Sequence, residues 1–194
     1  MHSPSFTPLQ RLEMFFRDPA EEPQLPGTLG TLYLLRRDIR DLQNALPEAA
    51  IWPRTMLVLA GIDLVAKFYC DNDNQRRVGG RFKTFVRERI THASPNAEGE
   101  AETVYQLRNS LLHSFGLYSQ GRGRTYRFVV THGSGNVLMT NDSANPEKWL
   151  VNLAVLQSRF EDAVMEYDRT LRSGEAPHPF SEALFDRYGW VSIR

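Results

Sequence analysis

Residues 104–116 read Val-Tyr-Gln-Leu-Arg-Asn-Ser-Leu-Leu-His-Ser-Phe-Gly. Apolar side chains recur in this stretch at steps of three and four residues, which is the period of an amphipathic α-helix. They are Val104, Leu107, Leu111 and Phe115. Gly116 follows directly, and glycine accepts the left-handed conformation that ends many helices. The stretch therefore predicts a helix that buries one face in a core and ends near residue 116.

Three polar side chains of this predicted helix, Arg108, Asn109 and His113, can act together on a phosphate group. A helix turns by about 100° per residue, so Arg108 lies at the edge of the apolar stripe while Asn109 and His113 stack on another face. A guanidinium binds phosphate oxygens through two parallel hydrogen bonds, and an imidazole exchanges a proton near neutral pH. A carboxamide can orient either the phosphate or the imidazole. The three residues are therefore the candidate catalytic residues.

A plainer interpretation is a solvated helix face. Arg108 would then pair with an acidic residue, while Asn109 and His113 would contact water. For an arbitrary helix this interpretation is favoured, because charged and amide side chains are exposed in most proteins.

The pattern Arg108-Asn109-x-x-x-His113, with leucines on both sides, resembles the signature of HEPN domains. Those domains are helical bundles found in ribonuclease toxins and in other nucleic-acid defence systems. Their motif is an arginine, usually followed by a polar residue, with a histidine four to six positions after the arginine. The match at these three residues favours phosphate chemistry over a solvated helix face.

The resemblance implies a metal-independent endoribonuclease of a toxin or defence system that uses no cofactor. In this activity Arg108 neutralises the scissile phosphate, His113 takes part in proton transfer, and Asn109 positions the phosphate or the imidazole. The expected substrate is RNA, because the reaction uses its 2′-hydroxyl and leaves 2′,3′-cyclic phosphate ends. The resemblance also implies a homodimer that pairs through the motif helix, and it admits a cognate antitoxin as a further partner.

Two other functions stay open. A non-catalytic HEPN-like bundle would bind a nucleotide, RNA or a partner protein, and the balanced charge of the chain slightly favours it. A helical dimerisation protein with a coincidental motif is the third interpretation.

The composition is typical of one compact globular domain, because 24% of the 194 residues are charged and 41% are hydrophobic. The chain has 23 Lys and Arg against 23 Asp and Glu. This balance argues against a protein that coats nucleic acid non-specifically, and it leaves room for a small basic site.

Cys70 is the one cysteine in the chain, so an internal disulfide and a multi-cysteine zinc site are excluded. It lies in an apolar run, where we expect a packed thiol rather than a nucleophile, and we predict no metal site.

Prolines and charges interrupt the apolar residues near the N-terminus. We therefore predict neither a signal peptide nor a membrane span, and expect a cytoplasmic location.

Residues 1–27 are rich in proline and predict an irregular lead-in, with at most a short helix over 8–17. A stripe of leucine and isoleucine predicts a helix over 28–46. Nearly every residue over 56–68 is apolar, so we expect the helix that opens at Pro53 to be central.

Asp63 lies in the middle of that apolar run. A carboxylate in such a place is rarely left without a partner. One candidate partner is Arg108, whose guanidinium Asp63 would then orient from behind the site. The other is Lys67, four residues later on the same helix. The sequence favours neither.

The densest basic region covers residues 76–89, and its apolar spacing predicts a helix that starts at Phe82, after a polar turn over 75–80, and ends near residue 94. Such a region is usually a solvated face, although in a neutral chain it could also bind a polyanion. The predicted substrate-binding residues are Arg76, Arg77, Arg81 and Arg87.

After residue 116 the period changes to two. Residues 126–131 alternate in polarity, a Gly-Ser-Gly-Asn turn follows, and 137–140 are again suited to a strand. This pattern predicts a β-hairpin inserted over about 124–140.

Asn145-Pro146-Glu147 is typical of a helix start, and apolar residues at steps of three and four continue as far as Gly174. We therefore predict the longest helix between Asn145 and Gly174, followed by an aromatic tail that docks back onto the other helices. Together the segments predict a mainly α fold in a single domain over 1–194. Its expected architecture is an up-down helical bundle of four to five helices with one small β-hairpin.

Overall fold

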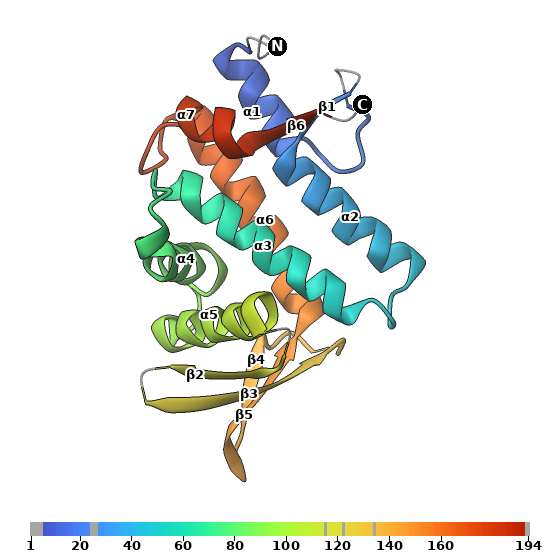
Figure 1. The fold of residues 1–194 in the computed structure, drawn as a ribbon, viewed down its shortest axis with the longest axis vertical. Coiled ribbons are helices and arrows are strands. Elements are labelled where there is room, and N and C mark those ends of the chain that lie inside the picture. Colours follow the sequence, from blue (N-terminus) through green and yellow to red (C-terminus); the bar gives the residue numbers. More distant parts are fainter. Residues whose placement is uncertain (1–5, 24–26, 115, 122, 134, 193–194) are drawn as a thin grey trace.

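The computed structural model describes residues 6–23, 27–114, 116–121, 123–133 and 135–192, and the side chains of His113 and Ser114 lie outside the description. Helices occupy the upper part of the molecule and a four-stranded sheet its lower end, with helix α5 between them (Figure 1). A second sheet, of two strands, lies at the opposite end. The prediction of a mainly α bundle with one small hairpin is therefore wrong, because both sheets are parts of the fold.

Helix α3 (Ile51–Tyr69) crosses the middle of the molecule. The helices that pack on it include α2 (Thr31–Ala45), α4 (Val78–Phe85) and α6 (Leu153–Ser173). A helix that is apolar around most of its circumference has to be covered by other elements on most sides. Gly61 allows α6 to come close, because a Cβ atom there would lie 2.6 Å from the ring of Phe160. The predicted central helix is confirmed, and it begins just before Pro53.

Helix α1 (Pro8–Phe16) begins with a capping box. The Thr7 hydroxyl accepts a hydrogen bond from the backbone of Gln10, and the Gln10 side chain accepts one from the backbone of Thr7. The ring of Phe15 packs on Phe68 of α3, with 4.4 Å between the ring centroids. The short helix predicted in this part of the chain is confirmed.

The C-terminal segment returns to α1 and α3. It consists of α7 (Glu182–Leu184), η3 (Phe185–Gly189) and β6 (Trp190–Ser192), and the last pairs antiparallel with β1 (Thr28–Gly30). Phe180 stacks on Phe68 with 5.2 Å between the ring centroids. The predicted docking of the aromatic tail is confirmed. Helix α2 begins at Thr31 rather than at the predicted residue 28, because the three residues before it form this strand pair.

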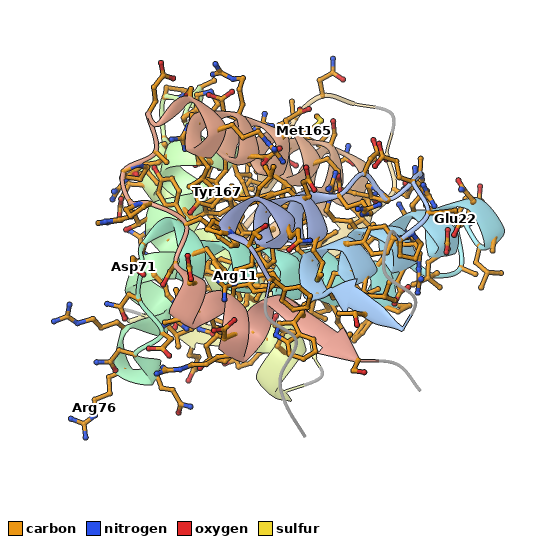
Figure 2. All side chains as sticks on the ribbon, turned by 90° about the horizontal axis from the view of Figure 1, so that it is seen from above. Arg11, Glu22, Asp71, Arg76, Met165 and Tyr167 are labelled. Carbon is orange, nitrogen blue, oxygen red and sulfur yellow. The ribbon has the colours of Figure 1, made fainter. Side chains whose placement is uncertain are left out.

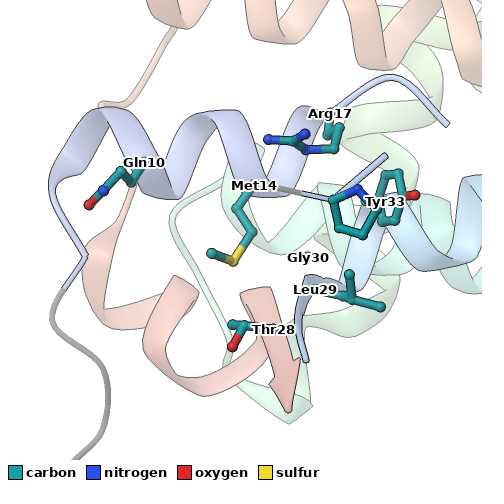
Figure 3. A pocket seen from close by; sticks show the side chains of 8 residues that line it. Gln10, Met14, Arg17, Thr28, Leu29, Gly30 and Tyr33 are labelled. Atoms are coloured by element: carbon teal, nitrogen blue, oxygen red, sulfur yellow. The ribbon is translucent and has the colours of Figure 1, made fainter. Parts of the chain in front are cut away.

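Gly30 lies directly against the backbone of α1. A Cβ atom built on Gly30 would overlap the carbonyl oxygen of Met14. A small cavity of about 60 Å³ lies beside this contact, and Met14, Leu29 and Tyr33 are among the residues that line it (Figure 3). The close packing of strand β1 against helix α1 therefore requires a glycine at position 30.

Gly30→Ala is expected to destabilise the protein by about 1–3 kcal/mol, because the methyl group must push β1 away from α1. Denaturant unfolding followed by circular dichroism measures this. Gly80→Ala is the matched control, because Gly80 lies in α4 and has nothing within 4 Å of an added Cβ. It is expected to be neutral or to stabilise by up to about 1 kcal/mol. Equal stability of the two variants would contradict the close approach at Gly30.

The basic region forms helical structure from its beginning. Its elements are η1 (Gln75–Arg77), α4 and η2 (Val86–Ile90), and they follow one another without a break. The polar turn predicted over 75–80 is therefore wrong, and the predicted helix starts earlier than Phe82. The motif helix is α5 (Ala97–Ser114), and the helix predicted there is confirmed.

The larger sheet holds four strands, β2 (Tyr118–Gly121), β3 (Arg124–Thr131), β4 (Met139–Asp142) and β5 (Asn145–Asn152). Their spatial order is β2-β3-β5-β4, with β3 and β5 parallel and the two outer pairs antiparallel. The predicted hairpin over 124–140 is wrong, because β3 and β4 are not neighbours and each pairs with β5. Strand β5 can take this central place because Trp149, Leu150 and Val151 supply apolar side chains to both of its faces.

The predicted helix start at Asn145 is wrong, and the cap lies at Asn152 instead. The Asn152 side chain accepts hydrogen bonds from the backbone of Ala154 and Val155. Asn152 follows Asn145 by seven residues, which is close to two helical turns. Trp149 of β5 lies four residues before Leu153, so it continues the apolar spacing of α6. Periodicity alone therefore could not reveal where the strand ends and the helix begins.

Helix α5 lies between the other helices and the large sheet. It contacts α3 and α4 on one side and β2 and β3 on the other. Its Gln106 accepts a hydrogen bond from Ser119 of β2 at 2.6 Å. No side chain over residues 100–112 is exposed. A second copy that pairs through this helix would therefore meet one of its two ends, and Glu98 is exposed in the first turn.

Candidate functional site

Arg108 and Asp63 form an ion pair between α5 and α3. The Arg108 Nη2 atom donates to Asp63 Oδ2 at 2.7 Å, and Arg108 is only 8% exposed. The second carboxylate oxygen of Asp63 lies 4.0 Å from Nη2 of Arg81 on α4. Of the two partners considered for Asp63 from the sequence, the structure shows Arg108. The hydrogen bond to this largely buried carboxylate fixes the direction of the Arg108 guanidinium.

A polar cleft of about 490 Å³ opens beside this ion pair, between α3, α4, α5 and the C-terminal segment. We call it the Arg108 cleft, and its lining residues are Asp63, Lys67, Asp73, Gln75, Val78, Arg81, Tyr105, Arg108 and Tyr188. A cleft of this volume can hold a small ligand or one nucleotide of a strand.

Positive charge is concentrated at the cleft. The cations that line it are Lys67, Arg81 and Arg108. With both lining carboxylates counted, three positive and two negative charges leave the lining residues a net charge of +1, and Asp63 lies among the cations. The other lining acid, Asp73, is paired with Arg187 at 2.7 Å, and this hydrogen bond holds the pKa of Asp73 below its ordinary value. Because the whole chain has no net charge, the cleft is a local site that favours an anion.

Lys67 extends from α3 toward the C-terminal segment. Its ammonium lies 4.6 Å from the centroid of the Tyr188 ring, a cation–π contact. Burial lowers the pKa of Lys67, and Arg81 and Arg108 lower it further against the opposing effect of Asp63. The lysine is thus held in a place that disfavours its own charge.

Asn109 and His113 follow Arg108 along α5. The Asn109 Oδ1 atom accepts a hydrogen bond of 3.3 Å from Arg108 Nη1. The backbone of His113 belongs to α5, and its side chain lies outside the described part of the structure. Residues 105, 109 and 113 recur at four-residue steps and so share one stripe of the helix. Because Tyr105 lines the Arg108 cleft, this stripe starts at the cleft and leads to the last turn of α5.

The four predicted substrate-binding arginines are not gathered in one place. Arg81 lines the Arg108 cleft. Arg76 and Arg77 are exposed and line a neighbouring depression of about 390 Å³ that also includes Arg81, and Arg76 projects away from the body of the protein (Figure 2). Arg87 lies on η2, where it pairs with two glutamates rather than lining the cleft.

Neither Tyr105 nor Tyr188 is predicted from the sequence as part of the site, and Lys67 is considered only as a partner of Asp63. Tyr105 stands three residues before Arg108, so helical spacing could have placed it on the same side. Tyr188 comes from the far end of the chain, and no spacing in the sequence connects it to the motif.

Among the described residues, no group of three or more His, Cys, Asp or Glu side chains could hold a metal ion. Cys70 ends α3, and its thiol donates a long contact of 3.9 Å to the carbonyl oxygen of Arg81. Burial raises the pKa of this thiol, as is typical of a packed cysteine. The helices of the described ranges are all too short or too polar to cross a bilayer.

Comparison with family models, with curated proteins and with solved structures found no match to this chain. Any functional assignment therefore rests on the residues and the geometry of the site.

Proposed function

We propose that the chain is a metal-independent endoribonuclease of the HEPN type, and that it acts on RNA at the Arg108 cleft. One observation carries this proposal. The arginine of the motif lines a cleft together with Lys67 and Arg81, where the charge favours an anion. The cytoplasmic location expected from the sequence is part of the proposal.

In the proposed reaction Arg108 binds the scissile phosphate. Asp63 and Asn109 contact the guanidinium through different nitrogen atoms, so its orientation is set before the substrate arrives. Donors that are fixed in advance stabilise the charge that develops on phosphate oxygens in the transition state. This role requires the planar guanidinium, because lysine offers a single charged centre without the paired donors.

His113 takes part in the proton transfers. The ribose 2′-oxygen forms a bond to phosphorus while the bond from phosphorus to the 5′-oxygen breaks. The 2′-hydroxyl loses its proton to a base, and the departing 5′-oxygen gains one from an acid. An imidazole can serve at either position near neutral pH. The products are a 2′,3′-cyclic phosphate end and a 5′-hydroxyl end.

Two copies are proposed to pair as a homodimer at the last turn of α5, where the backbone of His113 lies. No side chain over residues 100–112 is exposed, and of the two ends of α5 this turn is the one that carries the motif histidine. RNA is the proposed substrate, and a cognate antitoxin is a proposed further partner.

The second candidate function is non-catalytic binding of a nucleotide, RNA or a partner protein at the same cleft. The burial of Arg108 and its ion pair with Asp63 favour this candidate, because a guanidinium in that state also serves as a purely structural contact.

Arg108→Ala is expected to slow the cleavage of single-stranded RNA by about 10²–10³-fold, because it removes the group that stabilises the phosphate charge. Arg108→Lys should recover little of the rate. The rates are measured on end-labelled RNA in the presence of a chelator. Arg127→Ala is the matched control, because Arg127 is an exposed arginine on β3, and it should cleave at the wild-type rate.

Removing one partner of a largely buried ion pair also costs about 3–5 kcal/mol of stability. Each variant is therefore assayed at a temperature where unfolding measurements show it to be folded. Folded Arg108→Ala protein that cuts RNA at the wild-type rate would contradict the proposed reaction. If the wild type binds RNA through Arg108 and does not cut it, the binding candidate replaces the nuclease.

A further inference from the structure

The proposed reaction assigns a role to Arg108 and none to Lys67, which lines the same cleft. The acids of the cleft are engaged elsewhere, Asp63 with the two arginines and Asp73 with Arg187. Within the described ranges, the Lys67 ammonium contacts the face of the Tyr188 ring. A ring face attracts a cation and leaves its charge in place, so the N–H donors of Lys67 can still serve an anion.

Keeping Lys67 charged in this place opposes folding. Burial is the largest cause of the lowered pKa of Lys67, Arg81 and Arg108 lower it further, and Asp63 and Asp73 oppose the shift. A residue that is held at a cost to stability is expected where it serves a ligand. An anion in the cleft would relieve the repulsion among the three cations.

We infer that Lys67 binds a second phosphate of the RNA strand, next to the phosphate at Arg108, and that Tyr188 positions its ammonium. This inference rests on the proposed function, since it names a further contact of the same substrate. Lys67 lies one helical turn from Asp63 on α3, about 6 Å along the cleft wall from the residue that anchors Arg108. Lys67 and Arg108 thus line the same cleft, and a strand bound there can present one phosphate to each.

The substrate class follows from this arrangement. A strand that contacts both Arg108 and Lys67 presents at least two consecutive phosphates, so an oligonucleotide fits better than a mononucleotide. The cleft contacts phosphates through charge, which carries no information about base sequence. The Arg108 cleft should therefore set the position of the strand and leave base preference to other parts of the protein.

The experiment measures binding of a fluorescein-labelled single-stranded RNA of about ten nucleotides by anisotropy, with all variants built on His113→Ala so that the RNA stays intact. Lys67→Met is expected to weaken binding about tenfold. It should also reduce the slope of log K against log salt by roughly 0.7, the value for one lost phosphate contact on a single strand. Lys67→Arg should keep most of the affinity. Lys148→Met is the matched control, because Lys148 is a partly exposed lysine on β5, and its affinity and slope should match the parent.

Measurements of stability distinguish a ligand-binding role of Lys67 from a structural role. The folded pKa of Lys67 is lowered, so at alkaline pH below its ordinary value of 10.5 the unfolded chain binds a proton that the folded chain has lost. The free energy of unfolding therefore rises with pH in that window, and Lys67→Met should remove this rise. At neutral pH the same variant should melt at a higher temperature than its parent while it binds RNA more weakly.

Tyr188 is tested in the same assay. Tyr188→Phe keeps the ring and should keep the affinity, whereas Tyr188→Leu should weaken binding in part.

Lys67→Met protein that binds with the parent's affinity and salt slope would overturn the inference, as would one that loses affinity only because it melts early. If wild-type protein does not cut RNA but Lys67→Met still weakens binding, this inference stands and the nuclease fails. If RNA is cut and Lys67→Met binds normally, the nuclease stands and this inference fails.

Discussion

Ile62→Asp is expected to abolish the cooperative unfolding transition. Ile62 lies in the middle of α3 and is completely buried. A carboxylate at this place has no room for water or for a counter-charge, and burying it costs more than the typical stability of about 5–15 kcal/mol of a folded protein. Thermal melting followed by circular dichroism, together with size-exclusion chromatography, measures the outcome.

Met165→Asp is the matched control. Met165 is 56% exposed on α6, at the outer surface of the molecule (Figure 2). The same charge at this exposed place should change the free energy of unfolding by no more than about 0.5 kcal/mol. Ile62→Asp protein that melts cooperatively near the wild-type temperature would show that α3 is not the centre of the core.

His113→Ala is expected to slow RNA cleavage by roughly 10²-fold or more, because it deletes the group that transfers protons. RNA binding should persist, since the cations of the Arg108 cleft are unchanged. Gel analysis of end-labelled RNA gives the rate, and anisotropy gives the affinity.

His132→Ala controls for the loss of any histidine. His132 is exposed in the loop that follows β3, and its removal should be silent in both assays. If wild-type and His113→Ala proteins degrade RNA equally, the activity belongs to a contaminant, and the binding candidate replaces the nuclease.

The helices of the core could be predicted because their apolar spacing is local. Helix α3 is apolar around most of its circumference, with Asp63 and Lys67 on the side that lines the cleft, and such a helix lies at the centre of a fold. The short helix α1 is predicted only from the proline-free space after Pro8, and its capping pair, Thr7 and Gln10, is a further local signal. These signals lie within a few residues of one another and need no knowledge of the rest of the fold.

The strands were harder to predict because their pairing is not local. Strand β5 becomes a central strand only because β3 and β4 lie on either side of it. Its sequence starts with Asn145 and Pro146, which also start helices, and Trp149 stands in phase with the helix that follows. The partner of β1 is β6, at the other end of the chain, and a three-residue strand has too little pattern to be found alone.

The candidate site likewise combines residues that local sequence signals could identify with residues that only the tertiary fold brings together. Arg108 and Asn109 belong to one short motif, and the buried carboxylate of Asp63 made a cationic partner necessary. The structure shows that this partner is Arg108. The contributions of Lys67 and Tyr188 depend on the C-terminal segment returning to α3, which no residue spacing in the sequence reveals.

The decisive measurement compares two RNAs of identical sequence, one of them with a single 2′-deoxyribose at the preferred cut site. If the Arg108 cleft holds the phosphate while the 2′-hydroxyl attacks it, the wild-type protein cuts the all-ribose RNA to a 2′,3′-cyclic phosphate end. The same protein leaves the substituted site intact, and Arg108→Ala and His113→Ala cut the all-ribose RNA at the reduced rates given above. Equal cleavage of both RNAs, or 3′-hydroxyl ends on the products, would contradict this reaction.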